Sequence, residues 1–181
     1  MSVETATIVD RFESSLAELD VPVSHTTPAE FDRAIREAIE EPAVGTQLPF
    51  EGFDLPEEVN TSPTPTSLRA ATTGVTAAVF GIADYGSVAI RSTPEGAEPV
   101  SLFVDKHVAV LRRSDVLADM PTAIDRLGPS LRGGDSVVLA TGPSATADMG
   151  ALVRGAHGPE DVTVVLVDAD GHASDAGGDD T

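Results

Sequence analysis

Apolar residues recur every three or four positions in two segments near the start of the chain. In the first segment, 3–19, they are Ile8, Phe12, Leu16 and Leu19. The second segment follows Thr27-Pro-Ala-Glu30, which has the pattern of a capping box with proline at the first helical position. Its apolar residues are Phe31, Ala34, Ile35, Ala38 and Ile39. Both stripes predict amphipathic helices whose apolar faces belong to the core.

Between residues 68 and 111 the apolar residues come in short runs that predict strands. Runs 77–82 and 87–91 flank Ala83-Asp-Tyr-Gly86, a four-residue connection ending in glycine that predicts a β-hairpin. Two further runs, 101–104 and 107–111, are separated by Asp105 and Lys106.

Helical and strand patterns alternate in the rest of the chain. Ser114 is the predicted cap of a helix that Pro121 kinks or divides, and its apolar residues are Val116, Leu117, Met120, Ile124 and Leu127. Strands are predicted at 136–140 and 162–167, and a helix is predicted to begin near Thr146 between them. The alternation predicts an α/β fold, a mostly parallel sheet flanked by helices.

Composition divides the chain into three parts. Residues 1–66 are predicted to be N-terminal helices and an acidic, proline-rich linker, packed on or leading into the domain. Residues 67–168 are predicted to form the α/β domain. Residues 169–181 are an acidic, glycine-rich tail that we expect to be disordered.

The charge and the absent residue types narrow the function. The 181 residues carry a formal charge of −19, so nucleic acid and anionic membranes are poor partners. Lys106 is the only lysine beside ten arginines, and an acidic, lysine-poor surface suggests a salt-rich cytoplasm. There is no cysteine, so this chain cannot ligate an iron–sulfur cluster through thiolates. With no signal peptide or membrane-spanning run, the sequence predicts a cytoplasmic protein without membrane insertion.

Candidate chemistry is concentrated in four connections, which we expect at the carboxyl ends of the strands, where open α/β sheets bind ligands. After strand 136–140, Gly142-Pro-Ser144 turns into the predicted helix start. Its backbone N–H groups, with Ser144 and Thr146, could bind an anion, whereas Asp148 would oppose one. His157 lies in a glycine-flanked loop, and a ligand contact and a backbone contact are equally good interpretations of it.

The other candidates lie at the hairpin and before strand 107–111. Asp84 is either a general base or nucleophile or a turn aspartate. Lys106 is either a specific binding group or an exposed partner of Asp105. His107 is a candidate ligand-binding residue, which we interpret as a hydrogen-bonded residue in the wall of the site and not as a catalyst. The sequence has no nucleophile elbow, dinucleotide fingerprint or P-loop, and no metal site is predicted.

Three ordered motifs resemble one family. They are Gly74-Val-Thr-Ala-Ala-Val-Phe-Gly-Ile-Ala-Asp-Tyr-Gly-Ser-Val88, Gly142-Pro-Ser-Ala-Thr-Ala-Asp-Met149 and Val153-Arg-Gly-Ala-His-Gly-Pro159. Together they are similar to the LUD domain of LutC/YkgG-type lactate utilization proteins, over residues 68–167. Asp84 stands where the family usually has glutamate, and Tyr85 stands where it has a small residue.

The resemblance implies a fold of the NagB/RpiA/CoA transferase-like group and a part in oxidising L-lactate to pyruvate. It implies LutA/LutB-like partners that carry the iron–sulfur clusters, with no cofactor in this chain. The hairpin, through Gly86 and Ser87, and the Gly142 turn would then bind a small carboxylate or phosphate. Whether the chain is itself an enzyme stays open: alternatives are an isomerase or CoA-transferase type enzyme using Asp84, and a non-catalytic scaffold.

Overall fold

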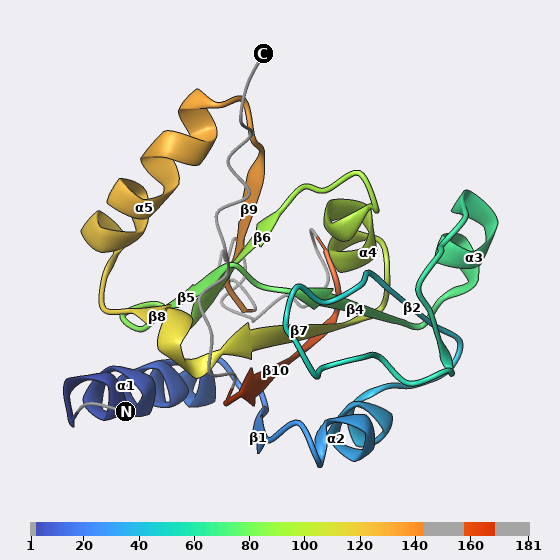
Figure 1. Cartoon of the computed structure of the whole chain (residues 1–181), viewed down its shortest axis with the longest axis horizontal. Coiled ribbons are helices and arrows are strands. Elements are labelled where there is room, and N and C mark those ends of the chain that lie inside the picture. The colour runs from blue at the N-terminus through green and yellow to red at the C-terminus, as the bar shows by residue number, and fades with distance from the viewer. Residues whose placement is uncertain (1–2, 143–157, 169–181) are drawn as a thin grey trace, which may run out of the picture.

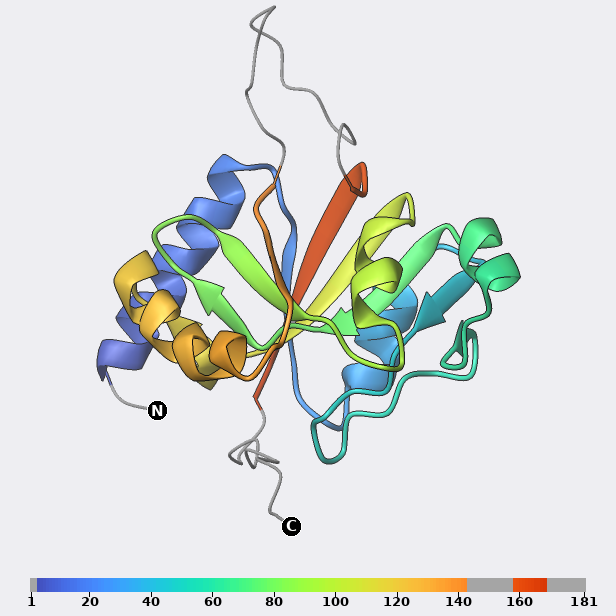
Figure 2. The same cartoon turned by 90° about the horizontal axis from the view of Figure 1, so that it is seen from above.

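The computed structural model describes residues 3–142 and 158–168, which form two β-sheets with helices around them (Figures 1 and 2). The larger sheet consists of β1 (Val23–Thr26), β2 (Ala43–Gly45), β3 (Val59–Asn60), β4 (Thr73–Ala77), β7 (Lys106–Arg112) and β10 (Asp161–Val167). Its six strands lie in the order β1-β10-β7-β4-β2-β3, and all neighbours are parallel. The predicted mostly parallel sheet is therefore confirmed.

A smaller second sheet was not predicted. It consists of β5 (Phe80–Ile82), β6 (Ser87–Arg91), β8 (Val116–Leu117) and β9 (Val137–Ala140). Its four strands lie in the order β8-β5-β6-β9, and β6 runs antiparallel to both neighbours. The predicted hairpin is confirmed as β5 and β6. The predicted strand 136–140 exists as β9, but it belongs to this sheet and not to the parallel one.

The larger sheet is covered on both faces, which explains why its central strands are apolar at nearly every position. On one face, Ala109 and Leu111 pack with α1 (Val3–Glu18) and the smaller sheet. On the other, Val108 and Val110 pack with α2 (Phe31–Ala38). Figure 2 shows the larger sheet between these layers, with β10 lying between β1 and β7.

The two N-terminal helices are confirmed, but the start of the second differs. α2 begins after Glu30, which makes no side-chain cap, and the Glu30 N–H donates to the Thr27 carbonyl in a turn. The capping box predicted at Thr27 was therefore wrong, because Pro28 lies in this turn and not in the helix. A capping box forms instead between Thr64 and Ser67, at the start of α3 (Pro65–Ala70).

The segment predicted as a polar linker, 41–67, contains β2, β3 and the start of α3. Its few aromatic residues are buried: the Phe53 ring packs edge-on against Phe31 of α2 at 5.1 Å between centroids, and Phe50 packs against Phe53 at 6.5 Å. The average composition of the segment did not indicate that Phe50 and Phe53 are buried, since they are single aromatic residues among prolines and acidic residues.

The run 77–82 was predicted as one strand, and the chain in fact changes sheets within it. The Ala78 N–H donates to the Val110 carbonyl in the larger sheet, and the Val79 N–H donates to the Ala89 carbonyl in the smaller one. An unbroken apolar run fits both sheets equally well, so periodicity could not locate the crossing.

The predicted strand 101–104 is wrong, because this stretch lies in and just after α4 (Ala97–Leu102). The buried residues Ala97, Val100, Ser101 and Val104 follow helical spacing. They pack against β4 at Gly74, where an added Cβ would lie closer than 3.0 Å to the Val100 carbonyl oxygen. The missing side chain is thus what lets α4 lie directly on the sheet.

The helix predicted to start at Ser114 starts later, as α5 (Met120–Arg132). Asp119 caps it by accepting from the Thr122 N–H at 2.9 Å, and Pro121 lies in its first turn, where proline is well tolerated. Ser114 lies in a 3₁₀ turn, and Val116 and Leu117 form β8. The helix predicted near Thr146 and the tail 169–181 lie outside the described residues.

Candidate functional site

Two of the predicted site residues, Lys106 and His107, lie at the amino ends of the strands of the larger sheet. The sequence predicted them at the carboxyl ends. Lys106 begins β7 and is in register with Thr73 and Asp161, which begin β4 and β10. Because residues 101–104 are not a strand, the Asp105–Lys106 junction precedes β7, so it lies at the amino ends of the strands. Glu160 is attached there as well, since its N–H donates to the Asp105 carbonyl.

The hairpin and the end of β9 meet in a pair of hydroxyl groups. Ser87 Oγ lies 2.6 Å from Thr141 Oγ1, because β6 and β9 pair with Val88 opposite Ala140. Ser87 is buried, whereas Thr141 is exposed. This Ser87–Thr141 pair joins the hairpin motif of the family resemblance to the residue directly before the Gly142 motif.

Two glycines let this pair sit against α1. Gly86 has a φ of +60°, and an added Cβ would come within 3.1 Å of the backbone of Leu16. At Gly142 an added Cβ would lie 3.1 Å from the Cβ of Leu19. Gly86, Ser87, Thr141 and Gly142 therefore form one cluster beside the end of α1, with two hydroxyls that can bind the oxygens of a small anion.

Asp84 at the tip of the hairpin is engaged by α1. Its Oδ1 lies 3.3 Å from Arg11 Nε, and the Asp84 and Arg11 side chains are 44% and 50% exposed. Arg11 also donates to the Ala118 carbonyl, and Ser15 donates to the Ala83 carbonyl at 2.7 Å. These contacts fix the hairpin on the helix and give Asp84 a surface ion pair in place of a position in a cleft.

Lys106 pairs with a residue that the sequence did not suggest. Its Nζ lies 3.1 Å from Glu40 Oε1. Glu40 is itself positioned by Thr73, whose Oγ1 accepts from the Glu40 N–H at 2.9 Å and donates to the Glu40 carbonyl at 2.8 Å. The only lysine thus joins the connection after α2 to the amino ends of β4 and β7.

His107 is a buried wall residue, as interpreted from the sequence. Its Nε2 lies 2.9 Å from Thr76 Oγ1, on the face of the larger sheet that also carries Ala109. Burial lowers the pKa of His107 to about 4 from an ordinary value of 6.5. The imidazole is therefore neutral at neutral pH, and one ring nitrogen shares a hydrogen with the threonine hydroxyl.

This burial predicts a dependence of stability on pH. Between pH 6.5 and 4 the unfolded chain binds a proton at this histidine and the folded chain does not, so stability falls as the pH falls through this window. At pH 5 we expect the wild type to lose about 2 kcal/mol of unfolding free energy relative to pH 7.5 from this residue. Urea unfolding of wild type and His107→Gln at both pH values measures it. An equal loss in both proteins would contradict the assignment.

An ion cluster at the carboxyl end of β7 was missed. Asp115 accepts from Arg112 Nε at 2.6 Å and from an Arg126 terminal nitrogen at 2.8 Å, and Asp115 and Arg112 are both buried. The Arg112 guanidinium also lies over the Phe50 ring, and that of Arg126 lies over the Phe80 ring. The only sequence signal was an arginine three residues before an aspartate at the end of an apolar strand.

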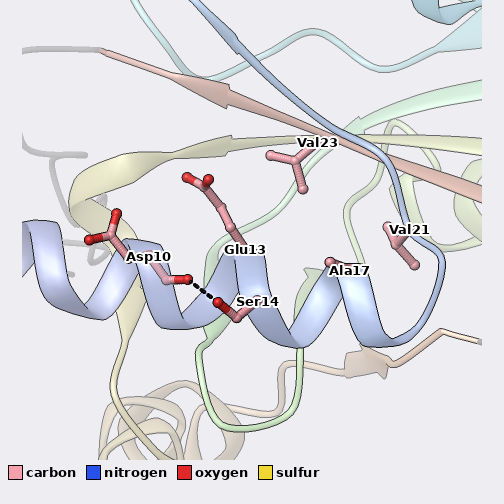
Figure 3. Close-up of a pocket in the computed structure, with 6 residues that line it drawn as sticks. All are labelled: Asp10, Glu13, Ser14, Ala17, Val21 and Val23. Carbon is pink, nitrogen blue, oxygen red and sulfur yellow. Dashed lines mark hydrogen bonds between the residues drawn. The ribbon is translucent and has the colours of Figure 1, made fainter.

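A pocket lies on the surface of α1 (Figure 3). It is lined by Asp10, Glu13, Ser14, Ala17, Val21 and Val23. Glu13 and Val23 lie close to one another there, and Glu13 also contacts His25 Nε2 at 3.0 Å. Two carboxylates on the wall repel an anion, so this pocket does not suit a small carboxylate or phosphate.

The remaining predicted site residues, Ser144, Thr146, Asp148 and His157, lie outside the described residues. Within residues 3–142 and 158–168, no group of three or more histidine or acidic side chains is arranged to hold a metal ion. In the same ranges no helix has both the length and the apolar character needed to cross a membrane.

Comparisons with known proteins agree on one family. The family model described as LUD domain matches residues 4–167. Lactate utilization protein C from Deinococcus radiodurans is 25% identical over 170 residues, which cover 90% of this chain and 80% of that protein. Lactate utilization protein C from Bacillus subtilis is 30% identical over 102 residues, and the match covers 54% of this chain and 42% of that protein. The uncharacterized protein YkgG of Escherichia coli is 27% identical over 103 residues, with 54% of this chain and 45% of that protein covered.

A solved structure shows the same fold. The crystal structure of a DUF162 family protein from Deinococcus radiodurans has a TM-score of 0.74 and 21% identity, covering 92% of this chain and 99% of that one. The family match starts at residue 4, so it includes the N-terminal helices that the resemblance over residues 68–167 left out. The chain spans less than half the length of the relatives from Bacillus subtilis and Escherichia coli.

Proposed function

Because the chain belongs to the LUD domain family, we propose that it is a LutC-like component of a cytoplasmic system that oxidises L-lactate to pyruvate. The observation that carries the proposal is the match to Lactate utilization protein C from Deinococcus radiodurans, which covers 90% of this chain. The proposal places the iron–sulfur clusters of such a system in LutA/LutB-like partner proteins, and the lack of cysteine in this sequence is compatible with that arrangement.

The Ser87–Thr141 pair is the proposed contact for a small carboxylate. Ser87 is held on a regular strand and Thr141 directly follows one, so the two hydroxyls are positioned before a ligand arrives. A carboxylate accepts hydrogen bonds from both hydroxyls when their mutual hydrogen bond is given up. The cost of that exchange is small, because one hydroxyl–hydroxyl bond is replaced by two charge-assisted ones.

A genetic experiment tests the role. Deletion of the gene in its own organism is expected to abolish growth on L-lactate while leaving growth on pyruvate unchanged. Wild-type protein should restore growth, and the Ser87→Ala/Thr141→Val double variant should restore it poorly. Normal growth of the deletion strain on L-lactate would overturn the proposal.

A binding experiment separates the ligand site from the role. L-lactate or pyruvate should raise the melting temperature of wild type, and the double variant should lose this shift. The matched control is Ser14→Ala, which removes an exposed hydroxyl on α1 that donates locally to the Asp10 carbonyl at 2.8 Å. Turnover of L-lactate by the purified chain alone would contradict an accessory role.

A further inference from the structure

Among the described residues, β9 is an edge strand of the smaller sheet. β9 has β6 on one side, and within the described residues no strand lies on the other. Its sequence, Val137-Val-Leu-Ala140, contains no charge and no proline, and Leu139 is 37% exposed. Natural edge strands are usually short, charged or covered, because an open apolar edge pairs with other chains.

The other edge strands are either shorter or more polar than β9. β3 and β8 are two residues each, and β1 carries Ser24 and His25 among its four residues. β9 is therefore the longest wholly apolar edge strand in the described part of the chain, and no described strand pairs with its free side.

Further exposed aliphatic side chains lie on α5, in addition to Leu139 of β9. Val137 packs against an apolar cluster that includes Ala123 and Leu127 of α5, and Leu139 lies on the same face of the sheet because it is two residues further along the strand. Ile124 and Leu131 are seven residues apart and so lie on one side of α5, and they are 52% and 47% exposed. Figure 1 shows α5 and β9 at the same end of the molecule.

The charge of this surface indicates what covers it. Along 120–140 the acidic Asp125 and Asp135 are balanced by Arg126 and Arg132, in a chain whose net charge is −19. A basic partner would be drawn to the acidic faces elsewhere and not to this neutral one. A second copy of the chain is acidic as well. Two such molecules repel each other least when their neutral surfaces face each other, so this surface favours contact with a second copy.

We propose that this chain forms a two-fold symmetric dimer by antiparallel pairing of β9 with β9 of a second copy. A two-fold axis perpendicular to the sheet pairs the two strands and makes one continuous sheet of the two smaller sheets. Both copies of α5 then lie on the same face, on either side of the junction. Leu139 and the exposed residues of α5 are buried between them.

Sedimentation velocity of the full chain in KCl tests the proposal. Wild type is expected to sediment with twice the mass of one chain. In Leu139→Lys, which places a charge on the edge at an exposed position, the dissociation constant should rise at least about tenfold. Leu131→Lys on α5 should weaken the dimer in the same direction, and it provides the test if Leu139→Lys does not fold.

The matched control is Phe103→Lys, because Phe103 is 74% exposed just after α4, outside the β9–α5 surface. It should leave the dimer intact. A monomeric wild type, a dimer unaffected by Leu139→Lys and Leu131→Lys, or equal dissociation in Phe103→Lys would each overturn the proposal. So would a wild type that is monomeric alone and pairs through β9 only with a different protein.

Discussion

Replacing Asp115 with alanine is expected to lower the free energy of unfolding by about 3–5 kcal/mol. The Asp115 carboxylate contacts Arg112, which is buried, and Arg126, which is partly exposed. Without it, the Arg112 guanidinium keeps its place in the interior but loses this counter-charge. Removing one member of a buried ion pair costs far more than the pair itself contributes, because the remaining charge stays away from water. Chemical denaturation at neutral pH measures the loss.

Asp84→Ala is the control for that experiment. Asp84 also pairs with an arginine, Arg11, but both side chains are about half exposed. The expected cost is about 1 kcal/mol or less, since water screens the pair before and after the change. If Asp115→Ala and Asp84→Ala lower the free energy of unfolding by the same amount, burial of the Arg112–Asp115 pair does not explain the loss expected for Asp115→Ala.

Gly74→Ala is the second large expected effect, with a loss of about 3 kcal/mol or more. The added Cβ would overlap the Val100 carbonyl oxygen and touch the Val104 side chain. The obstacle is backbone, so α4 has to move away from β4 as a unit. Thermal and urea unfolding measure the loss, and the residual fold is checked by circular dichroism.

Gly128→Ala supplies the contrast within the same chain. The nearest atom to an added Cβ there is the flexible Arg132 guanidinium, at 3.3 Å. Because Gly128 lies inside α5 but directly precedes Pro129, contact between the added Cβ and the proline ring offsets the gain in helix propensity, so the net change should stay within about 1 kcal/mol. A Gly74→Ala protein as stable as Gly128→Ala would show that α4 is not held against the sheet.

The sequence predicted those elements whose pattern has one structural interpretation. The stripe containing Phe12 and Leu16 fits only a helix, and the run ending at Leu111 is too apolar for anything but a covered strand. The run around Val79 fits two sheets at once, and the stretch around Val100 is too short for its period to separate strand from helix. Tertiary contacts decided both, and those contacts involve residues far away in the sequence.

The candidate site was predicted unevenly for a similar reason. Composition singled out Lys106 correctly as unusual but could not supply Glu40, its partner from another element. The Ser87–Thr141 contact depends on the pairing of β6 with β9, which short-range motifs do not encode. Asp115 lacked any motif, because a buried ion cluster is defined by where the chain brings Arg126.

The position of β10 has a consequence for how the protein is made. Residues 164–167 pair with residues 23–26 on one side, and β10 pairs with β7 on the other. A ribosome releases β1 and β7 well before β10, so the larger sheet lacks an inner strand until translation reaches residue 167. Until then, apolar residues of β1 and β7 that β10 covers stay exposed to solvent. A chaperone or early assembly would protect them during this period. Premature termination before residue 161 would therefore leave β1 detached from the rest of the sheet, not merely trim an edge.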